Sequence, residues 1–256
     1  MSTEFVVKSS DSLLLEKATR VAREFAQPYA GGEVVGIVFL GAIARGYFDD
    51  AADIDIAFFK KQASEVPLSA KFIEVEGLEV HCWLSDYEDE LASPWDMAKR
   101  WTFSHAQILH DPLGSISRLL RDKVSLTTTE KRRLLMSGLV LSEWYINRLT
   151  RLWVKRGNII SAHHMFHQGL DYFFDMLFAL NGELVPDMKW RYYCSERLPL
   201  LPRGYREGIE GAMVLHSFSA EELERRQGSF MGMWREMKPA VEREVQMTFD
   251  EMKQVV

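Results

Sequence analysis

The sequence predicts an α+β protein, with a mixed sheet and flanking helices in its first part and only helices in its second part. Two short apolar runs, at residues 34–40 and 53–59, are bounded by glycine or charged residues, as is typical of buried strands. From Ser115 onward the apolar residues recur at helical spacing, and strand signals are few. We therefore expect two domains, residues 1–114 carrying the sheet and residues 115–256 forming an all-helical domain.

The composition is that of a globular protein and argues against several classes of function. Hydrophobic residues make up 47% of the 256 positions, enough for a sizeable core. The formal net charge of −6 argues against a general nucleic-acid binder, which must neutralise phosphates. Cys82 and Cys194 form no CxxC pair, so we expect no zinc site, no disulfide framework and a reducing compartment. The sequence shows neither a signal peptide nor an apolar stretch of the roughly 18 residues that span a bilayer, which predicts a cytoplasmic protein with no membrane partner.

The elements of the first domain follow from helix and strand signals in chain order. Asp11 and the serines before it can cap a helix that Pro28 ends. Gly77 marks a turn between two short strands, and the acidic run at residues 86–90 is expected to be a solvated turn. The expected elements are a helix at residues 12–27, strands at 34–40 and 53–59, two short strands within 71–84, a helix from Pro94, and an edge strand that begins at Gln107.

Two aspartates on the second strand are the strongest sign of chemistry. Because side chains alternate along a strand, Asp53 and Asp55 project from one face while Ile54 and Ile56 project from the other. Two carboxylates that point the same way repel each other, and a divalent cation such as Mg²⁺ removes that conflict. Backbone N–H groups at the turn of Gly41 can hold a phosphate. A phosphate-binding turn beside paired metal ligands suggests nucleotidyl transfer.

The same stretch resembles the nucleotidyltransferase superfamily that includes the bacterial aminoglycoside and lincosamide nucleotidyltransferases. The matching residues are Gly41, the run Ala44-Arg45-Gly46 and the run Asp53-Ile54-Asp55. The resemblance implies that Arg45 and the amides near Gly41 and Ala42 steady a nucleoside triphosphate. Ala42 departs from the family pattern, which usually has Ser or Thr there, with a hydroxyl that helps to hold the phosphates.

The segment Leu78-Glu79-Val80 is similar to a Leu-Glu-Val segment of the streptomycin/spectinomycin-type adenylyltransferases. The resemblance implies that Glu79 is the third acidic residue of the site and the general base for the attacking hydroxyl. Glu74 and Glu76 are competing candidates that precede the turn. His81 and Trp83 share the face of Glu79. His81 could line the substrate pocket, but a lone histidine in a strand is more often structural, and Trp83 is expected to pack rather than to stack on a ligand.

The second part is expected to consist of long helices, at residues 127–155 and 161–180, followed by two helices that meet around residues 228–231. The resemblance extends loosely to the segment after Asn181, where a lysine beyond a proline contacts nucleotide phosphates. It implies this role for Lys189, with Arg191 and Arg197 as alternatives.

A cluster of polar residues on the helix at 161–180 remains without an assigned role. His164, His167 and Asp171 share one helical face, and His163 and Asp175 lie nearby in the sequence. No HExxH-type metal spacing is present. We expect polar side chains that face the interdomain cleft, where the resemblance places an acceptor substrate.

The mechanism that the resemblance implies uses two metal ions. Asp53 and Asp55 would hold Mg²⁺ ions about 3.5–4 Å apart, and Glu79 would take a proton as an acceptor hydroxyl attacks the α-phosphorus of ATP and releases pyrophosphate. The implied acceptor is a small aminoglycoside-like compound, and the acidic chain suits a cation. Loss of one hydroxyl at Ala42 would cost about 1.5–3 kcal/mol of phosphate binding, so we expect an impaired but competent enzyme.

Two other functions stay open on the sequence. One is a non-catalytic nucleotidyltransferase-like partner of a toxin–antitoxin pair, although such partners are usually shorter than this chain. The other is an enzyme that nucleotidylates a protein side chain. An oligomer is compatible with the exposed aromatic residues, but no pattern singles out a dimer face, and no nucleic-acid partner is expected.

Overall fold

The computed structural model describes residues 11–66 and 71–256. The chain divides into two compact units that meet between Ser125 and Leu126. This boundary lies eleven residues past the one expected at residue 114. The helix α5 (Ser115–Lys123) packs on strand β1 (Val34–Phe39) and so belongs with the sheet. In the part of the chain that the structure describes, no helix combines the length and apolar character of a membrane span.

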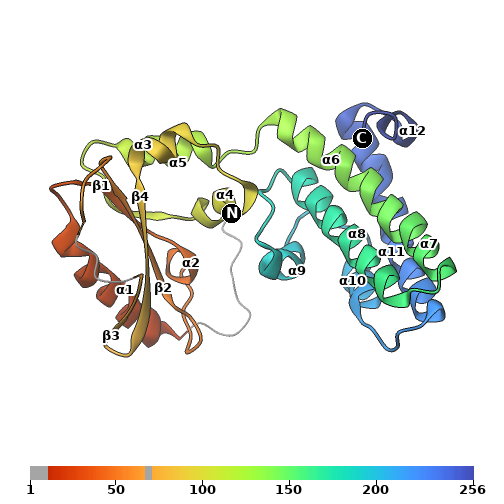
Figure 1. Ribbon diagram of the computed structural model, residues 1–256, viewed down its shortest axis with the longest axis horizontal. Coiled ribbons are helices and arrows are strands. Elements are labelled where there is room, and N and C mark those ends of the chain that lie inside the picture. The colour runs from red at the N-terminus through yellow and green to blue at the C-terminus, as the bar shows by residue number, and fades with distance from the viewer. Residues whose placement is uncertain (1–10, 67–70) are drawn as a thin grey trace. The chain divides into compact units, whose positions relative to one another are not determined.

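The first unit is a five-stranded mixed sheet with helices on both faces (Figure 1). The strand order is β3-β4-β2-β1-β5, in which β2 and β4 run parallel and the other neighbours run antiparallel. This arrangement confirms the predicted fold class. Its elements are α1 (Ser12–Ala26), a 3-10 turn (Gln27–Tyr29), β1 (Val34–Phe39), α2 (Gly41–Ala44), β2 (Ile54–Lys60), β3 (Phe72–Val75), β4 (Leu78–Asp86), α3 (Tyr87–Ala92), α4 (Met97–Phe103), β5 (Gln107–His110) and α5 (Ser115–Lys123).

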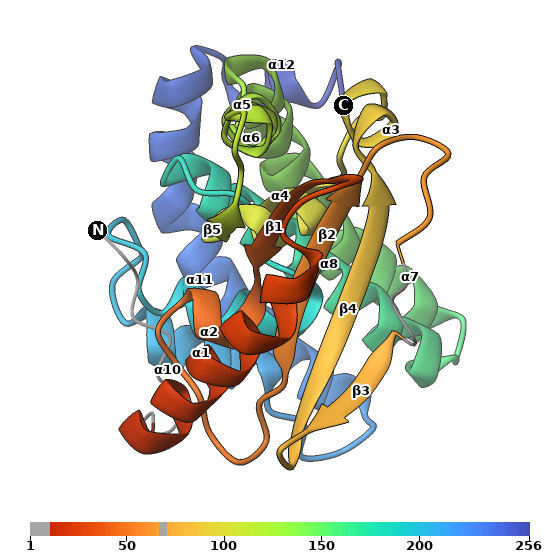
Figure 2. The ribbon, with the colours of Figure 1, turned by 90° about the vertical axis from the view of Figure 1, so that its left-hand side faces the viewer.

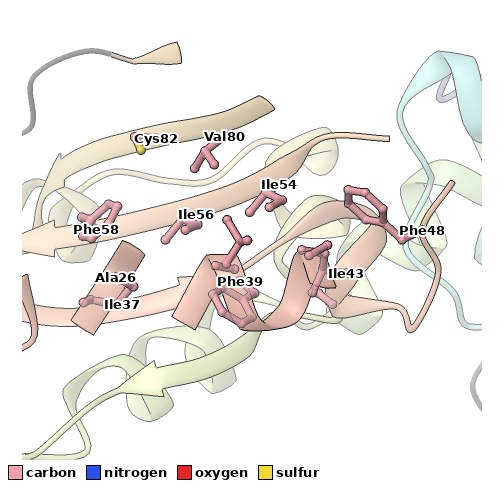
Figure 3. Packing of buried hydrophobic residues seen from close by; sticks show 14 of the residues in the cluster. Ala26, Ile37, Phe39, Ile43, Phe48, Ile54, Ile56, Phe58, Val80 and Cys82 are labelled. Atoms are coloured by element: carbon pink, nitrogen blue, oxygen red, sulfur yellow. The ribbon is translucent and has the colours of Figure 1, made fainter. Parts of the chain in front are cut away.

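One face of the sheet packs against α1, which lies along it in Figure 2. Figure 3 shows Ile54, Ile56 and Phe58 of β2 in this core beside Val80 and Cys82 of β4. The opposite face packs against residues of α4 and α5. Because β2 buries its isoleucines beneath α1, the alternation of the chain turns Asp55, and Asp53 just before the strand, to the other face, as predicted.

The turn at Gly77 joins two antiparallel strands, as predicted. Glu76 and Gly77 both have positive φ angles, +51° and +75°, between the paired residues Val75 and Leu78. Two-residue turns of this kind match the twist of a hairpin. The hairpin brings β3 to the edge of the sheet beside β4, and β4 then pairs with β2 on its other side.

Two expected features of the first unit are wrong in detail. The acidic run at residues 86–90 forms the start of helix α3 instead of a solvated turn. Its Glu90 is buried and accepts hydrogen bonds from Trp95 Nε1 and Lys99 Nζ, at 2.6 and 2.7 Å. The helix expected from Pro94 begins later, because the Asp96 side chain caps it by accepting from the Lys99 amide.

All regular secondary structure in the second unit is helical. The expected helix at 127–155 begins at a capping box formed by Thr127 and Glu130, but a π-helical segment interrupts it. The break expected around residues 228–231 is wrong, because α11 continues through this region with Phe230 and Trp234 buried on its inner side. The elements are α6 (Thr128–Glu143), the π-helical segment (Trp144–Leu149), α7 (Thr150–Lys155), α8 (Ile159–Leu180), a 3-10 turn (Met188–Trp190), α9 (Arg191–Ser195), α10 (Tyr205–Met213), α11 (Ala220–Val245) and α12 (Phe249–Met252).

Candidate active site

The parallel pairing of β2 with β4 brings the predicted acidic residues together. In the register of these strands, Asp55 lies opposite His81 and Ile54 lies opposite Val80. Neighbouring residues in register project to the same face of a sheet, and residues two apart on a strand share a face. Asp53 and Asp55 therefore share one face with Glu79 and His81.

The side chain of His81 lies among three carboxylates. Its Nε2 donates to Glu79 Oε1 at 2.6 Å. Its Nδ1 lies 3.0 Å from Asp53 Oδ2 and 3.8 Å from Asp55 Oδ1. The ring of Phe72 on β3 packs edge-on against the imidazole, with 4.5 Å between ring centroids. These contacts fix the orientation of the imidazole from several sides.

The sequence left His81 between the substrate pocket and packing, and did not join it to the acidic residues that surround it in the structure. Its position two residues after Glu79, on the same strand face, is visible in the sequence but does not by itself indicate a metal ligand. The residue becomes informative only once β4 is known to pair with β2. The other candidate bases lie differently: Glu74 is opposite Glu79 on the edge strand, and Glu76 pairs with Arg20 at 2.7 Å.

Gly41 lies directly against the carboxylate of Asp55. Its φ angle of +61° is in the left-handed region, and its amide follows Leu40, whose N–H donates to the Asp55 carbonyl at 2.9 Å. A Cβ atom at this position would overlap Asp55 Oδ2 and lie 3.3 Å from Asp55 Cγ. The glycine is therefore required twice, for the turn itself and for the close approach of the aspartate.

The guanidinium of Arg45 braces the same turn. It donates to the Gly41 carbonyl at 3.3 Å and to the Trp101 carbonyl at 3.2 Å, and it stacks over the Trp101 ring at 4.5 Å. These contacts connect the glycine turn to helix α4. They show how Arg45 supports the turn, whereas its contact with phosphates stays a prediction.

The residues of this face suit a divalent cation. Ligand atoms of Asp53, Asp55 and His81 all lie within 4.8 Å of one another, and all three residues are half-buried. Asp53 and Asp55 carry like charges that a cation would offset, and carboxylate and imidazole donors both bind divalent metals. Cys82 follows on the opposite face, and burial raises the pKa of its thiol to about 11, so it supplies no thiolate.

Two of the predicted nucleotide contacts, Ala42 and Lys189, are not among the three residues of this cluster. Ala42 is half-buried in α2 and packs against the core beneath α1. Lys189 belongs to the second unit, where its exposed side chain follows Asp187, whose carboxylate accepts from the Lys189 amide at 3.3 Å. The role of Lys189 at the phosphates stays a prediction.

Two of the three histidines of α8, His163 and His167, contact a buried arginine. Arg226 of α11 is fully buried; its Nη1 donates to His163 Nδ1 at 2.8 Å and its Nη2 to His167 Nε2 at 3.3 Å. Burial, followed by the charge of Arg226, lowers the pKa of both imidazoles. Neutral rings can accept these hydrogen bonds, so His163 and His167 hold the arginine within the helical unit.

The comparisons with known proteins are consistent with this fold. No family model matches the sequence, and no curated protein is significantly similar to it. The structure is similar to the crystal structure of a nucleotidyltransferase-like protein from Exiguobacterium sibiricum 255-15, with a TM-score of 0.50. The two chains are 14% identical, and the similarity covers 92% of this chain and 79% of that one. At this identity the similarity shows a shared fold.

Proposed function

We propose that this chain is a metal-dependent nucleotidyltransferase that transfers AMP from ATP to a hydroxyl of a small acceptor. The observation that carries the proposal is that Asp53, Asp55 and Glu79 share one face of the sheet around His81, with Asp55 against the turn of Gly41. The fold shared with a nucleotidyltransferase-like protein supports the same reaction class. A cationic, aminoglycoside-like acceptor would suit the net charge of −6.

Each residue of the chain has a distinct task in this proposal. Asp53 and Asp55 would hold Mg²⁺, which supplies charge stabilisation for the triphosphate when bound. The turn of Gly41, braced by Arg45, offers backbone amides to the phosphates. His81 fixes Glu79 through Oε1, which leaves Oε2 as the oxygen that we assign to proton transfer.

The proposed reaction forms one bond and breaks one bond at the α-phosphorus. The acceptor oxygen attacks, its proton passes to Glu79, and the bond between the α-phosphorus and the bridging oxygen breaks to release pyrophosphate. General-base assistance of this kind contributes about 10²–10⁴-fold to a rate. Lys189 is proposed as a further phosphate contact from the helical unit.

Titration with ATP in the presence of Mg²⁺ tests the proposal directly. We expect binding at millimolar nucleotide or below, and a loss of about 100-fold or more in affinity for Asp55→Asn, because the metal clamp supplies several kcal/mol. Asp50→Asn is the matched control, since Asp50 is an exposed loop residue outside the cluster. Absence of ATP binding by the unsubstituted protein would reject the proposed function.

The substitution Ala42→Ser tests the missing hydroxyl. A hydrogen bond to a charged phosphate contributes about 1.5–3 kcal/mol, so we expect ATP affinity to rise about tenfold or more. Isothermal titration with a non-hydrolysable ATP analogue measures the change, and Ala42→Gly is the control without a hydroxyl. Equal affinities of the serine variant and the unsubstituted protein would show that residue 42 does not reach the phosphates.

A further inference from the structure

Histidine is an unusual neighbour for a site that uses Mg²⁺ alone. Mg²⁺ prefers oxygen ligands in near-octahedral geometry, whereas imidazole nitrogen favours first-row transition ions. His81 Nδ1 nevertheless faces Asp53 Oδ2 and Asp55 Oδ1, at 3.0 and 3.8 Å. A nitrogen that can act as a metal ligand therefore faces both aspartates.

The other nitrogen of the ring is positioned as in known metal sites. Histidines that bind metals usually donate the remaining N–H to a carboxylate, which fixes the tautomer and makes the ligand more basic. His81 Nε2 donates to Glu79 Oε1 at 2.6 Å, a short charge-assisted hydrogen bond. Phe72 packs edge-on against the same ring and limits its rotation.

We infer that His81 is a metal ligand through Nδ1, that Glu79 orients it, and that the site binds a transition divalent ion such as Mn²⁺ in preference to Mg²⁺. The inference rests on the proposed function, because it concerns the same metal site. It gives Glu79 a second task beside proton transfer. The two aspartates and the imidazole then form a ligand set of two oxygens and one nitrogen from adjacent strands.

The test uses Mn²⁺ without nucleotide, because the nitrogens of the adenine base would add their own signal. Electron spin-echo envelope modulation of the unsubstituted protein with one equivalent of Mn²⁺ should show coupling to a ¹⁴N nucleus. His81→Asn should abolish this coupling and lower the ratio of Mn²⁺ to Mg²⁺ affinity by about tenfold. His105→Asn, at a histidine outside the cluster, should leave both unchanged.

A second variant separates the two tasks of Glu79. Loss of an orienting carboxylate typically lowers metal affinity by about 10–100-fold, so Glu79→Gln should weaken Mn²⁺ binding by that factor. If Glu79 served in proton transfer alone, the variant would lose turnover and keep its Mn²⁺ affinity, which would contradict its orienting task.

The failure of this inference differs from the failure of the proposed function. Mn²⁺ that binds without ¹⁴N coupling, or coupling that persists in His81→Asn, would overturn the inference. If the same protein still bound ATP in a Mg²⁺-dependent way, the proposed function would stand. A protein that binds neither Mn²⁺ nor Mg²⁺-ATP would overturn both.

Discussion

Replacing Gly41 by alanine is expected to lower metal-nucleotide affinity by about 100-fold while the protein still folds. The new Cβ atom would overlap Asp55 Oδ2, and the flexible end of that side chain is the part that can move. Relief of the overlap therefore displaces the carboxylate that the site needs. Because a ligand must be held within fractions of an ångström, a displaced carboxylate loses most of its contribution.

Gly46→Ala is the matched control for this substitution. Gly46 also has a left-handed φ angle, +72° against +61° for Gly41, but a Cβ atom there would meet no atom within 4 Å. Both variants should lose about 1–2 kcal/mol of stability through backbone strain, measured by thermal unfolding. Only Gly41→Ala should lose binding, measured by calorimetric titration with Mn²⁺ and an ATP analogue. Equal binding by the two variants would show that the contact between Gly41 and Asp55 is dispensable.

The local parts of the site could be predicted from the sequence because they depend on short-range geometry. The alternation Asp53-Ile54-Asp55-Ile56 fixes which side chains share a face whenever the segment is a strand. The left-handed φ of Gly41 and the turn at Gly77 follow from the conformations that glycine tolerates. The α+β class followed from the same apolar runs.

The strand pairing could not be predicted in this way. Nothing in the local pattern states that β2 (Ile54–Lys60) pairs in parallel with β4 (Leu78–Asp86), across the intervening hairpin. Pairing is decided by how both strands bury their apolar faces beneath α1. The position of Glu79 therefore came from the resemblance. His81 was not placed beside Asp53 and Asp55 because those two residues belong to another part of the chain.

Errors in the helical unit have a similar cause. Gly228 suggested a helix end, yet α11 continues because packing of its apolar side outweighs the cost of about 1 kcal/mol for a glycine in a helix. The polar cluster on α8 also could not be interpreted from spacing alone. The partner of His163 and His167, Arg226, lies about sixty residues away in the sequence.

The same helix α8 carries a half-buried carboxylate, Asp175, whose Oδ1 is enclosed and which is expected to make stability depend on pH. Arg191 Nη1 lies 3.3 Å from both Asp171 Oδ1 and Asp175 Oδ1. Burial nevertheless raises the pKa of the Asp175 carboxyl from 3.8 to about 6, with the nearby charge of Asp171 adding to the rise and that of Arg191 opposing it. At neutral pH the folded protein therefore holds a charge that burial disfavours.

The sign of the pH dependence follows from proton linkage. Between about pH 4 and 6 the folded state binds more protons at Asp175 than the unfolded state does. The contribution of Asp175 to the free energy of unfolding is thus most favourable below pH 4 and is lost as the pH rises through 6. The difference between the two pKa values of Asp175, 3.8 and about 6, corresponds to about 3 kcal/mol in the free energy of unfolding.

Asp175→Asn should therefore stabilise the helical unit at pH 7.5 by about 2 kcal/mol, since the amide avoids the buried charge but binds Arg191 less well. The gain over the unsubstituted protein should shrink toward zero near pH 4, as measured by hydrogen-exchange protection of α8 amides at matched pH values. Asp171→Asn is the control, because it removes the other carboxylate that contacts Arg191. The side chain of Asp171 is 32% exposed, against 22% for Asp175. An equal gain in both variants would mean that relief of repulsion between the two aspartates, rather than burial of Asp175, sets the stability of α8.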